Sequence, residues 1–281
     1  MNYRHAFHAG NHADVLKHFI LSRVLGLLGR KETPLAYLDS HSGLGLYDLM
    51  GDQATRTGEW REGIARLWAA FDVPAPLTSY LDIVRDMNPD GELRFYPGSP
   101  EVARRLTRPQ DRLLFNEWHP DDGQLLKANM AQDRRTVIHQ RDGWLLPKAL
   151  LPTQEKRAVL LVDPPFEQAD DWTRCALALK ESIGRMRQSV AMIWYPIKDQ
   201  RQLKRFYQEL QKSGAPKLLR AELSVHPVDN PIGLNGSGMA IANPPWGLEE
   251  ELRQVLPWLA KQLCQSQSGW RLDWLIEERP A

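Results

Sequence analysis

The stretch Val159-Leu160-Leu161-Val162-Asp163-Pro164-Pro165-Phe166 decides the fold. Four apolar residues run directly into an acid, and such a run predicts a short strand that is buried on both faces, as in a parallel sheet. The two prolines end the strand, because neither can donate a ladder hydrogen bond and the second restricts the backbone of the first. A stiff loop therefore follows at the carboxyl end of the strand, which is where open α/β sheets bind their ligands.

This loop offers groups that suit a planar heterocycle with an exocyclic amino group. The Asp163 carboxylate and the Pro164 carbonyl can each accept one N–H, and the Phe166 ring can stack on the heterocycle. The combination resembles the Asp/Asn-Pro-Pro-aromatic motif of the amino-methyltransferases, which use S-adenosylmethionine to methylate adenine N6, cytosine N4 or glutamine. A plain strand followed by a proline turn is the alternative for this tetrapeptide taken alone.

The composition is that of an ordinary globular protein. The chain has 281 residues, of which 42% are hydrophobic and 25% are charged, so we expect one α/β domain over residues 1–281. Its two cysteines, Cys175 and Cys264, are far apart, which fits a reducing compartment and offers no metal motif. No apolar run reaches the roughly 18 residues that span a membrane, and the charged start argues against a secretory signal. We therefore expect a cytoplasmic protein without a membrane partner.

The order of the predicted elements indicates a doubly wound, Rossmann-like α/β sheet that is preceded by a helix capped by Asn11. The acid that ends the second strand usually follows the glycine loop by about 20 residues, whereas Glu117 follows it by about 70. The excess predicts an insertion over residues 50–95, with helices over 59–71 and 77–87. Strands are expected over 35–39, 112–115, 136–139, 159–162, 190–194, 218–225 and 239–242, and a loop over 226–238.

Two strand ends carry the pattern of a nucleotide pocket. Ser40-His41-Ser42-Gly43-Leu44-Gly45 is a glycine-rich turn of the kind that opens nucleotide-binding folds. Asp48 stands where the dinucleotide fingerprint has its third glycine, which argues against NAD or FAD and against an oxidoreductase. Glu117 is expected to accept ribose hydroxyls. Asp142-Gly143 after the third strand either meets an adenine ring or forms a simple Asp-Gly turn.

A second motif, Asn243-Pro244-Pro245-Trp246, fits the same loose pattern as the Asp163 loop. We expect it in the last strand, far along the chain from the glycine loop. A methyl acceptor must lie next to the strand that binds the cofactor, and Asp163 holds that fourth-strand position. The reaction is therefore expected at Asp163.

Several stretches together closely resemble the bacterial 23S ribosomal RNA adenine-N6 methyltransferase family of the J type. The resemblance runs nearly end to end, and it implies a class I methyltransferase with a helical insertion. It implies transfer from S-adenosylmethionine to one adenine of large-subunit ribosomal RNA, at the position that the family name gives as 2030. The stretches are Tyr3 to His18, Asp39-Ser40-His41-Ser42-Gly43-Leu44-Gly45, Tyr96-Pro97-Gly98-Ser99-Pro100 and the two Pro-Pro motifs.

Matched residue by residue, the resemblance implies a catalytic Asp163, with Pro164 and Phe166 beside it. Family members carry tyrosine at the position of Phe166, so ring stacking is kept here while a hydroxyl hydrogen bond is lost. The substrate positions are Tyr3, His5 and Lys17 of the N-terminal arm, together with Phe166. The expected cofactor contacts are His18, His41, Gly43, Ser99, Glu117, Asp142, Gly143 and Asp163.

Four histidines near the start, His5, His8, His12 and His18, raise the question of a metal site. No cysteine or paired acid accompanies them and the reaction needs no metal, so we expect none. We expect hydrogen-bonding groups near cofactor and RNA instead, and a satisfied core histidine is the less favoured alternative for His18.

The expected partner is 23S ribosomal RNA, as protein-free RNA or in an early assembly particle, with no obligatory protein partner. The net charge is only +1, so RNA would need a local basic surface. The N-terminal quarter and residues 198–204 are candidates, and either could be a solvated helix face. One rival function is DNA adenine-N6 methylation, which usually needs a larger recognition domain. Another is a non-catalytic RNA-binding module, which the intact Asp163 motif disfavours.

Overall fold

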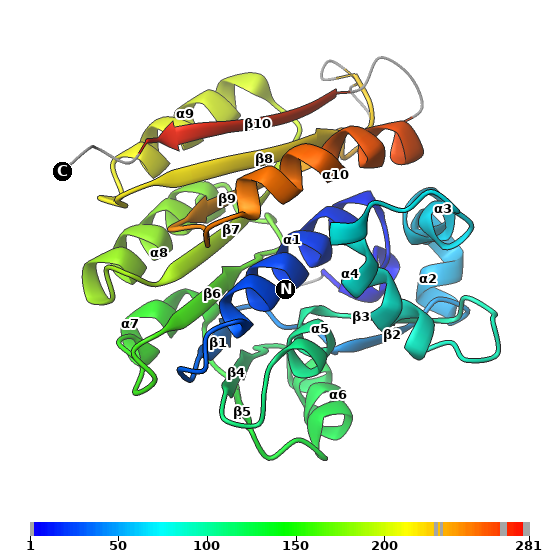
Figure 1. Cartoon of the computed structure of the whole chain (residues 1–281), viewed down its shortest axis with the longest axis horizontal. Coiled ribbons are helices and arrows are strands. Elements are labelled where there is room, and N and C mark those ends of the chain that lie inside the picture. Colours follow the sequence, from blue (N-terminus) through cyan, green and yellow to red (C-terminus); the bar gives the residue numbers. More distant parts are fainter. Residues whose placement is uncertain (1–2, 228–229, 231–232, 265–268, 278–281) are drawn as a thin grey trace.

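A mixed sheet runs through the computed structural model, which describes residues 3–227, 230, 233–264 and 269–277 (Figure 1). In the described residues its strand order is β10-β8-β9-β7-β6-β1-β4-β5. The neighbours from β7 to β5 pair in parallel, whereas β9, β8 and β10 are antiparallel to their neighbours. The strands are β1 (Ala36–Asp39), β4 (Arg112–Asn116), β5 (Thr136–His139), β6 (Ala158–Val162), β7 (Val190–Ile197), β8 (Leu218–Ser224), β9 (Gly236–Ala242) and β10 (Gly269–Ile276).

Helices cover both faces of the sheet, which makes the fold Rossmann-like as the sequence predicted. β1 and β6 are buried on both faces, because alternate residues such as Leu160 and Leu161 enter two different hydrophobic clusters. The helices of one face are α1 (His12–Gly29), α4 (Ala75–Asp86), α5 (Ser99–Leu106), α6 (Pro120–Met130) and α10 (Leu248–Leu263). Those of the other are α7 (Leu146–Leu150), α8 (Asp171–Arg185) and α9 (Gln200–Gln211).

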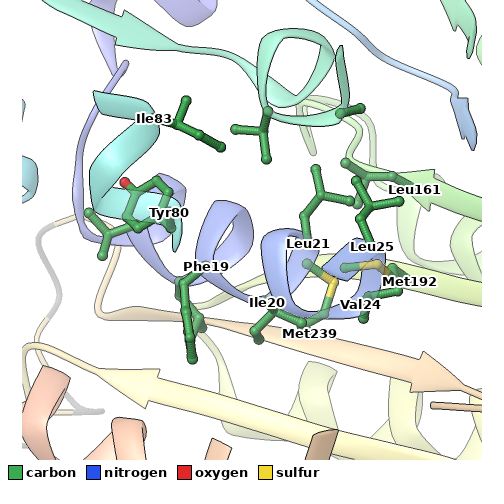
Figure 2. Packing of buried hydrophobic residues seen from close by; sticks show 14 of the residues in the cluster. Phe19, Ile20, Leu21, Val24, Leu25, Tyr80, Ile83, Leu161, Met192 and Met239 are labelled. Carbon is green, nitrogen blue, oxygen red and sulfur yellow. The ribbon is translucent and has the colours of Figure 1, made fainter. Parts of the chain in front are cut away.

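Helix α1 is buried on most of its sides. Asn11 caps it as predicted, because its side chain accepts hydrogen bonds from the backbone N–H groups of Ala13 and Asp14. Figure 2 shows the apolar residues of α1 between α4 and sheet residues such as Leu161 and Met192. Each such side chain contributes about 1.5–3 kcal/mol by its burial. The helix is therefore a firm support for the polar residues near its start.

A short antiparallel pair, β2 (Leu46–Asp48) and β3 (Phe95–Pro97), flanks the segment that was predicted as an insertion. Between the two strands lie α2 (Asp52–Thr57), η2 (Glu59–Glu62), α3 (Ile64–Trp68) and α4. The expected helix over 59–71 is wrong as one element. It is broken at Gly63, where a Cβ atom would lie 2.1 Å from the Gly10 carbonyl oxygen.

Two other expectations need correction. The predicted loop over 226–238 ends earlier, because Gly236 already begins β9. Asn243 follows β9, and β9 is not the last strand, since β10 comes after it. Asp48, in the position of the third fingerprint glycine, belongs to β2. Within the described residues, no helix is long and apolar enough to cross a membrane.

Candidate active site

A cavity of about 610 Å³ opens at the edge of the sheet where β1, β4, β5, β6 and β7 end. The loops after these strands line the cavity, together with the start of α1 and the N-terminal arm, residues 3–11. Ligands of open α/β sheets bind at this edge. The residues predicted for the site all line this one cavity: Tyr3, His5, Lys17, His18, His41, Gly43, Ser99, Glu117, Asp142, Gly143, Asp163, Pro164 and Phe166.

Asn116, the buried last residue of β4, holds two of these loops together. Its side-chain amide donates hydrogen bonds to the carbonyl oxygens of Ser40 and Arg141, both at 3.0 Å. Its backbone N–H donates to the hydroxyl of Ser42 at 3.1 Å. A buried amide with satisfied partners fixes its surroundings, so the glycine loop and the loop after β5 keep a set separation.

The glycine loop and Glu117 are joined directly. Gly43 has φ +61°, a conformation that favours glycine, and a Cβ atom there would lie 2.3 Å from the Tyr47 hydroxyl oxygen, so a larger residue would displace the Tyr47 ring. The Gly43 N–H donates to Glu117 Oε2 at 2.9 Å, and the His119 N–H donates to Oε1 at 2.8 Å. Burial raises the pKa of Glu117, against the effect of these two donors. An ionised carboxylate has roughly four acceptor sites, so Glu117 can still accept from a ligand.

The Asp142-Gly143 pair forms the turn that the sequence offered as one of two alternatives, and it stands at the cavity. Asp142 Oδ1 accepts from the Trp144 N–H at 3.1 Å, so Asp142 caps a short helical turn as an Asp-Gly turn would. Both residues also line the cavity. A Cβ atom at Gly143 would lie 2.4 Å from the Ser40 carbonyl oxygen, so glycine lets the two loops approach closely.

His18 and Ser99 bring hydrogen-bonding groups to the lining of the cavity. His18 Nδ1 lies 2.9 Å from the Tyr96 hydroxyl, and its buried Nε2 has no partner among the described residues. Burial lowers the pKa of His18 to about 3, so the ring is neutral. Ser99 is the first residue of α5, and its hydroxyl donates to Asp39 Oδ2 at 2.6 Å. Burial raises the pKa of Asp39 to about 6.

Asp163 lies directly after β6 and forms an ion pair with Lys17 of α1. The distance from Lys17 Nζ to Asp163 Oδ2 is 2.6 Å, and that to Asp14 Oδ1 is 2.7 Å. Burial alone would lower the pKa of Lys17, but the two carboxylates outweigh it and raise the pKa. β6 pairs in parallel with β1, so Asp163 lies beside the strand that carries the glycine loop, as the sequence predicted.

The N-terminal arm is tied to the same ion-pair cluster. Asp14 Oδ2 lies 3.0 Å from His5 Nε2, and His5 Nδ1 lies 2.8 Å from the Tyr3 hydroxyl. The Tyr3 ring also stacks on His8 with a centroid distance of 5.5 Å. His8 Nδ1 in turn lies 2.8 Å from Glu59 Oε1, in the predicted insertion. His5 and His8 therefore each have their own polar partners.

Phe166 belongs to an aromatic cluster at the cavity wall. It has φ +52°, a conformation that costs a non-glycine residue on the order of 1–3 kcal/mol. The conformation places its ring 4.7 Å from that of Trp172 and 5.7 Å from that of Trp194, centroid to centroid. Phe166 and Trp194 both line the cavity, so a flat ligand could be held by either ring.

The second Pro-Pro motif lies at the opposite edge of the sheet. β9 is antiparallel to β7, and Ala242 pairs with Ala191 near the start of β7. The Asn243 side chain donates to the carbonyl oxygens of Arg187 and Ser189, both at 2.9 Å, before β7 begins. Asn243 does not line the cavity, which agrees with the choice of Asp163.

Sequence patterns missed several residues of the cavity. Asp14 precedes Lys17 by one helical turn, a spacing at which charged side chains meet, so a signal was available. Trp118 directly follows Glu117, and Trp144 directly follows Gly143 and meets the His41 ring edge-on at 5.2 Å. In the sequence, only the position of Trp118 and Trp144 next to predicted contact residues indicates that they line the cavity.

A mostly parallel sheet with helices on both faces, and a cavity at its carboxyl edge beside the first strand, place the protein in the class of Rossmann-like α/β folds that bind a ligand at this edge. A family model described as Ribosomal RNA large subunit methyltransferase D, RlmJ, matches residues 32–276. The chain belongs to this family, so the resemblance seen in the sequence is confirmed.

Two relatives named Ribosomal RNA large subunit methyltransferase J are similar over nearly the whole chain. The Escherichia coli K12 protein is 42% identical over 279 residues, which are 99% of this chain and 100% of the relative. The Haemophilus influenzae protein is 41% identical over 280 residues, with 99% and 100% covered. A crystal structure of a Legionella pneumophila protein is 32% identical, with a TM-score of 0.89 over 95% of this chain and 98% of that one.

Proposed function

We propose that this methyltransferase transfers a methyl group from S-adenosylmethionine to the exocyclic N6 of one adenine in 23S ribosomal RNA, at the position that the family name gives as 2030. Membership of the ribosomal RNA family supports the substrate class. The observation that carries the proposal is Asp163, which stands at the cavity next to the glycine loop and is ion-paired with Lys17.

The cavity offers groups that fit S-adenosylmethionine, and that cofactor supplies a methyl group activated by a sulfonium. His18 and the first turn of α5 at Ser99 would hold its carboxylate, because unpaired N–H groups of a helix start favour an anion. Glu117 would accept the ribose hydroxyls. The remaining cofactor contacts would come from His41, Gly43, Asp142, Gly143 and Asp163.

We further propose that Asp163 and the Pro164 carbonyl bind the two N6 hydrogens of the target adenine. Two acceptors draw these hydrogens into one orientation and localise the nitrogen lone pair, so catalysis is mainly positioning and electrostatics. The ion pair with Lys17 presents Asp163 as a carboxylate, which can accept a hydrogen bond. Asp163 or water then takes the proton that N6 loses. Phe166 would stack on the base, which must leave its own stack to reach the cavity.

Contacts of the N-terminal arm support a role for Tyr3, His5 and Lys17 in ordering the site around the RNA. We propose that residues 50–95 form an insertion subdomain that holds this arm. Glu59 bonds to His8 and to Asn11, and the Thr57 hydroxyl donates to the Phe7 carbonyl oxygen.

Of the two basic segments, we propose residues 198–204 for contact with RNA phosphates. Lys198 is exposed and lines the cavity, and Arg201 and Lys204 are exposed on α9. In the N-terminal quarter, the buried Lys17 is paired with Asp163 and Arg23 is paired with Glu251, so neither charge is available to an RNA phosphate. Protein-free RNA or an early assembly particle would expose the single-stranded target that such a cavity needs.

The test is labelled methyl transfer from S-adenosylmethionine to protein-free 23S RNA, with duplex DNA in parallel and nucleoside analysis of the product. We expect N6-methyladenosine in RNA only, with loss of transfer in Asp163→Ala. The matched control is Asn243→Ala in the second Pro-Pro motif, which should retain transfer. Label in DNA alone would contradict the RNA substrate. Tight cofactor binding without transfer to either nucleic acid would favour a binding module.

A further inference from the structure

We propose that the edge of the sheet opposite the cavity is a second contact surface for RNA, which binds phosphates of a segment remote from the target adenine. The inference rests on the proposed function, because it takes long ribosomal RNA as the substrate. It concerns the affinity for this RNA and leaves the methyl-transfer step unchanged. We call this surface the basic edge and define it by five exposed residues: Lys31, Arg134, Lys156, Arg187 and Trp246.

The topology of the sheet brings the four basic residues to one edge. β5, β4, β1, β6 and β7 are neighbours in that order and run in parallel, so the turns before them all lie where the strands begin. Lys31, Lys156 and Arg187 precede β1, β6 and β7, which are adjacent strands, and Arg134 precedes β5. Neighbouring strands are roughly 4.8 Å apart, so the five strand starts extend over about 19 Å.

The four basic side chains carry charges that no neighbouring acid neutralises. In the described part of the chain none of them forms an ion pair, whereas Arg108 pairs with Asp111 at 2.9 Å and Arg135 pairs with Asp133. Among the described residues directly before these strands, Glu32 is the one exposed acid. A chain with a net charge of only +1 therefore has a local excess of positive charge at this edge, as a nucleic-acid surface does.

Two further arginines hold the segment that carries Lys31. Arg108 donates three hydrogen bonds and Arg157 donates two to backbone carbonyl oxygens of residues 28–33. Burial lowers the pKa of Arg157, and the charge of Arg108 nearby lowers it further. The fold therefore crowds positive charges at this edge although they repel one another, and it fixes the backbone of the Lys31 segment before any ligand binds. A preformed basic surface of this kind suits a polyanion.

The second Pro-Pro motif lies at the same edge and offers an aromatic side chain. The Asn243 side chain donates to the carbonyl oxygen of Arg187 at 2.9 Å, so the motif is fixed against the turn before β7. Three residues later in the chain, Trp246 is 91% exposed. An exposed indole beside basic side chains suits RNA, because an unpaired base can stack on the ring while phosphates bind the charges. The motif that resembles the Asp163 loop therefore has a role of its own.

A long RNA can reach both the cavity and the basic edge, whereas a short one cannot. The cavity lies at the carboxyl ends of the same parallel strands, and those of four or five residues are roughly 13–17 Å long. The RNA must in addition pass around the helices that cover a face of the sheet. A single strand that carries only the target adenine and its nearest neighbours would therefore occupy the cavity alone. The basic edge thus favours large RNA over short fragments.

The test compares two triple variants that lose the same charge. The affinity of each for protein-free 23S RNA and for the short single strand is measured over a range of salt concentrations. Calorimetry gives the affinity for S-adenosylmethionine, which reports whether the cavity is intact. The basic-edge variant is Lys31→Gln/Lys156→Gln/Arg187→Gln, and the control, on exposed helix faces elsewhere, is Lys127→Gln/Lys180→Gln/Lys261→Gln.

Each lost contact with a single-stranded phosphate removes about 0.7 from the slope of log affinity against log salt concentration. We therefore expect the basic-edge variant to have a slope shallower by about 2, and to bind 23S RNA about 100-fold more weakly at about 0.1 M salt. Its affinity for the short strand and for S-adenosylmethionine, and its transfer rate at saturating RNA, should not change. The control should match the wild type. Trp246→Ala should weaken binding of 23S RNA without changing the slope, because stacking releases no phosphate counterions.

An unchanged slope in the basic-edge variant would overturn the inference. So would an equal loss of affinity in the control, or an equal loss for the short strand. A wild-type protein that binds 23S RNA through this edge but transfers no methyl group to it would support the basic edge and contradict the proposed function. Methyl transfer to RNA with no effect of the basic-edge variant would do the reverse, so the two failures can be told apart.

Discussion

Replacement of Lys17 by methionine is expected to destabilise the fold at neutral pH and much less at acidic pH. The Lys17 ammonium lies within 2.7 Å of carboxylate oxygens of both Asp14 and Asp163. The side chains of Lys17, Asp14 and Asp163 are only 5%, 1% and 14% exposed. Methionine keeps much of the side-chain volume, so the main loss is the charge that the two carboxylates share.

The expected cost at pH 7 is about 3–5 kcal/mol, the usual result of removing one partner of a buried ion pair. Burial by itself raises the pKa of Asp14, but the charges of His5 and Lys17 outweigh burial and lower it. A depressed pKa contributes stability above the unfolded-state value of about 4, and this stability is lost as the pH falls. Without Lys17, burial should raise the pKa of Asp14, and the variant should then lose stability as the pH rises from about 4 to that raised value.

Urea unfolding at pH 7 and near pH 4 measures the loss of stability and its pH dependence. The difference in the free energy of unfolding between wild type and variant should be smaller at the lower pH. Adding Asp14→Asn to Lys17→Met should recover part of the stability at pH 7, since one unpaired buried carboxylate is removed. Methyl transfer should not recover, because Asp163 still lacks its partner. Lys180→Met, on the exposed side of α8, is the control. A loss below about 1 kcal/mol, or a loss independent of pH, would refute the reasoning.

Three other changes have expected outcomes. Gly143→Ala should abolish cofactor binding in calorimetry, because its Cβ atom would lie 2.4 Å from the Ser40 carbonyl oxygen. Gly184→Ala is the control and should bind the cofactor normally, since a Cβ atom there has no neighbour within 4 Å. Equal binding by both variants would contradict the close approach of Gly143 to Ser40. Asn243→Ala should lose about 1–3 kcal/mol in urea unfolding, since two carbonyl oxygens lose a donor, and yet keep its rate of methyl transfer. The hydrogen bond that His8 donates to the Glu59 carboxylate raises the pKa of His8, so the stability that this pair adds should be present below about pH 6.5 and fade as the pH rises through the raised value. The pH profile of unfolding should lose this step equally in Glu59→Gln and His8→Gln; a step that persists in either would assign it to another group.

The core strands could be predicted because each is a short apolar run that ends in a polar or proline-rich turn. β2 and β3 could not, since each has three residues and they pair across the whole predicted insertion, which leaves no local period to detect. β10 was missed although Trp270, Leu272 and Trp274 alternate with polar residues, a signal typical of a strand. The sequence alone therefore carries the signal for this strand.

The site shows a similar division between local and long-range information. Residues at the ends of parallel strands were predicted to meet, because such ends share one edge of the sheet. Tyr80 and Tyr96 were not predicted as partners of His18, since Tyr96 and His18 are 78 positions apart in the sequence. The packing of α1 against α4 and the β2–β3 pair brings the Tyr96 hydroxyl within hydrogen-bond distance of both His18 and Tyr80.

The two Pro-Pro motifs show what a local pattern lacks. Both follow a buried strand, and both pair an acceptor side chain with an aromatic ring. β6 is parallel to β1, so Asp163 reaches the cavity, whereas β9 is antiparallel to β7, so Asn243 emerges at the other edge and caps backbone carbonyls there. The direction of a strand is set by the connections of the whole chain, and it decides which of two nearly identical loops can meet a ligand.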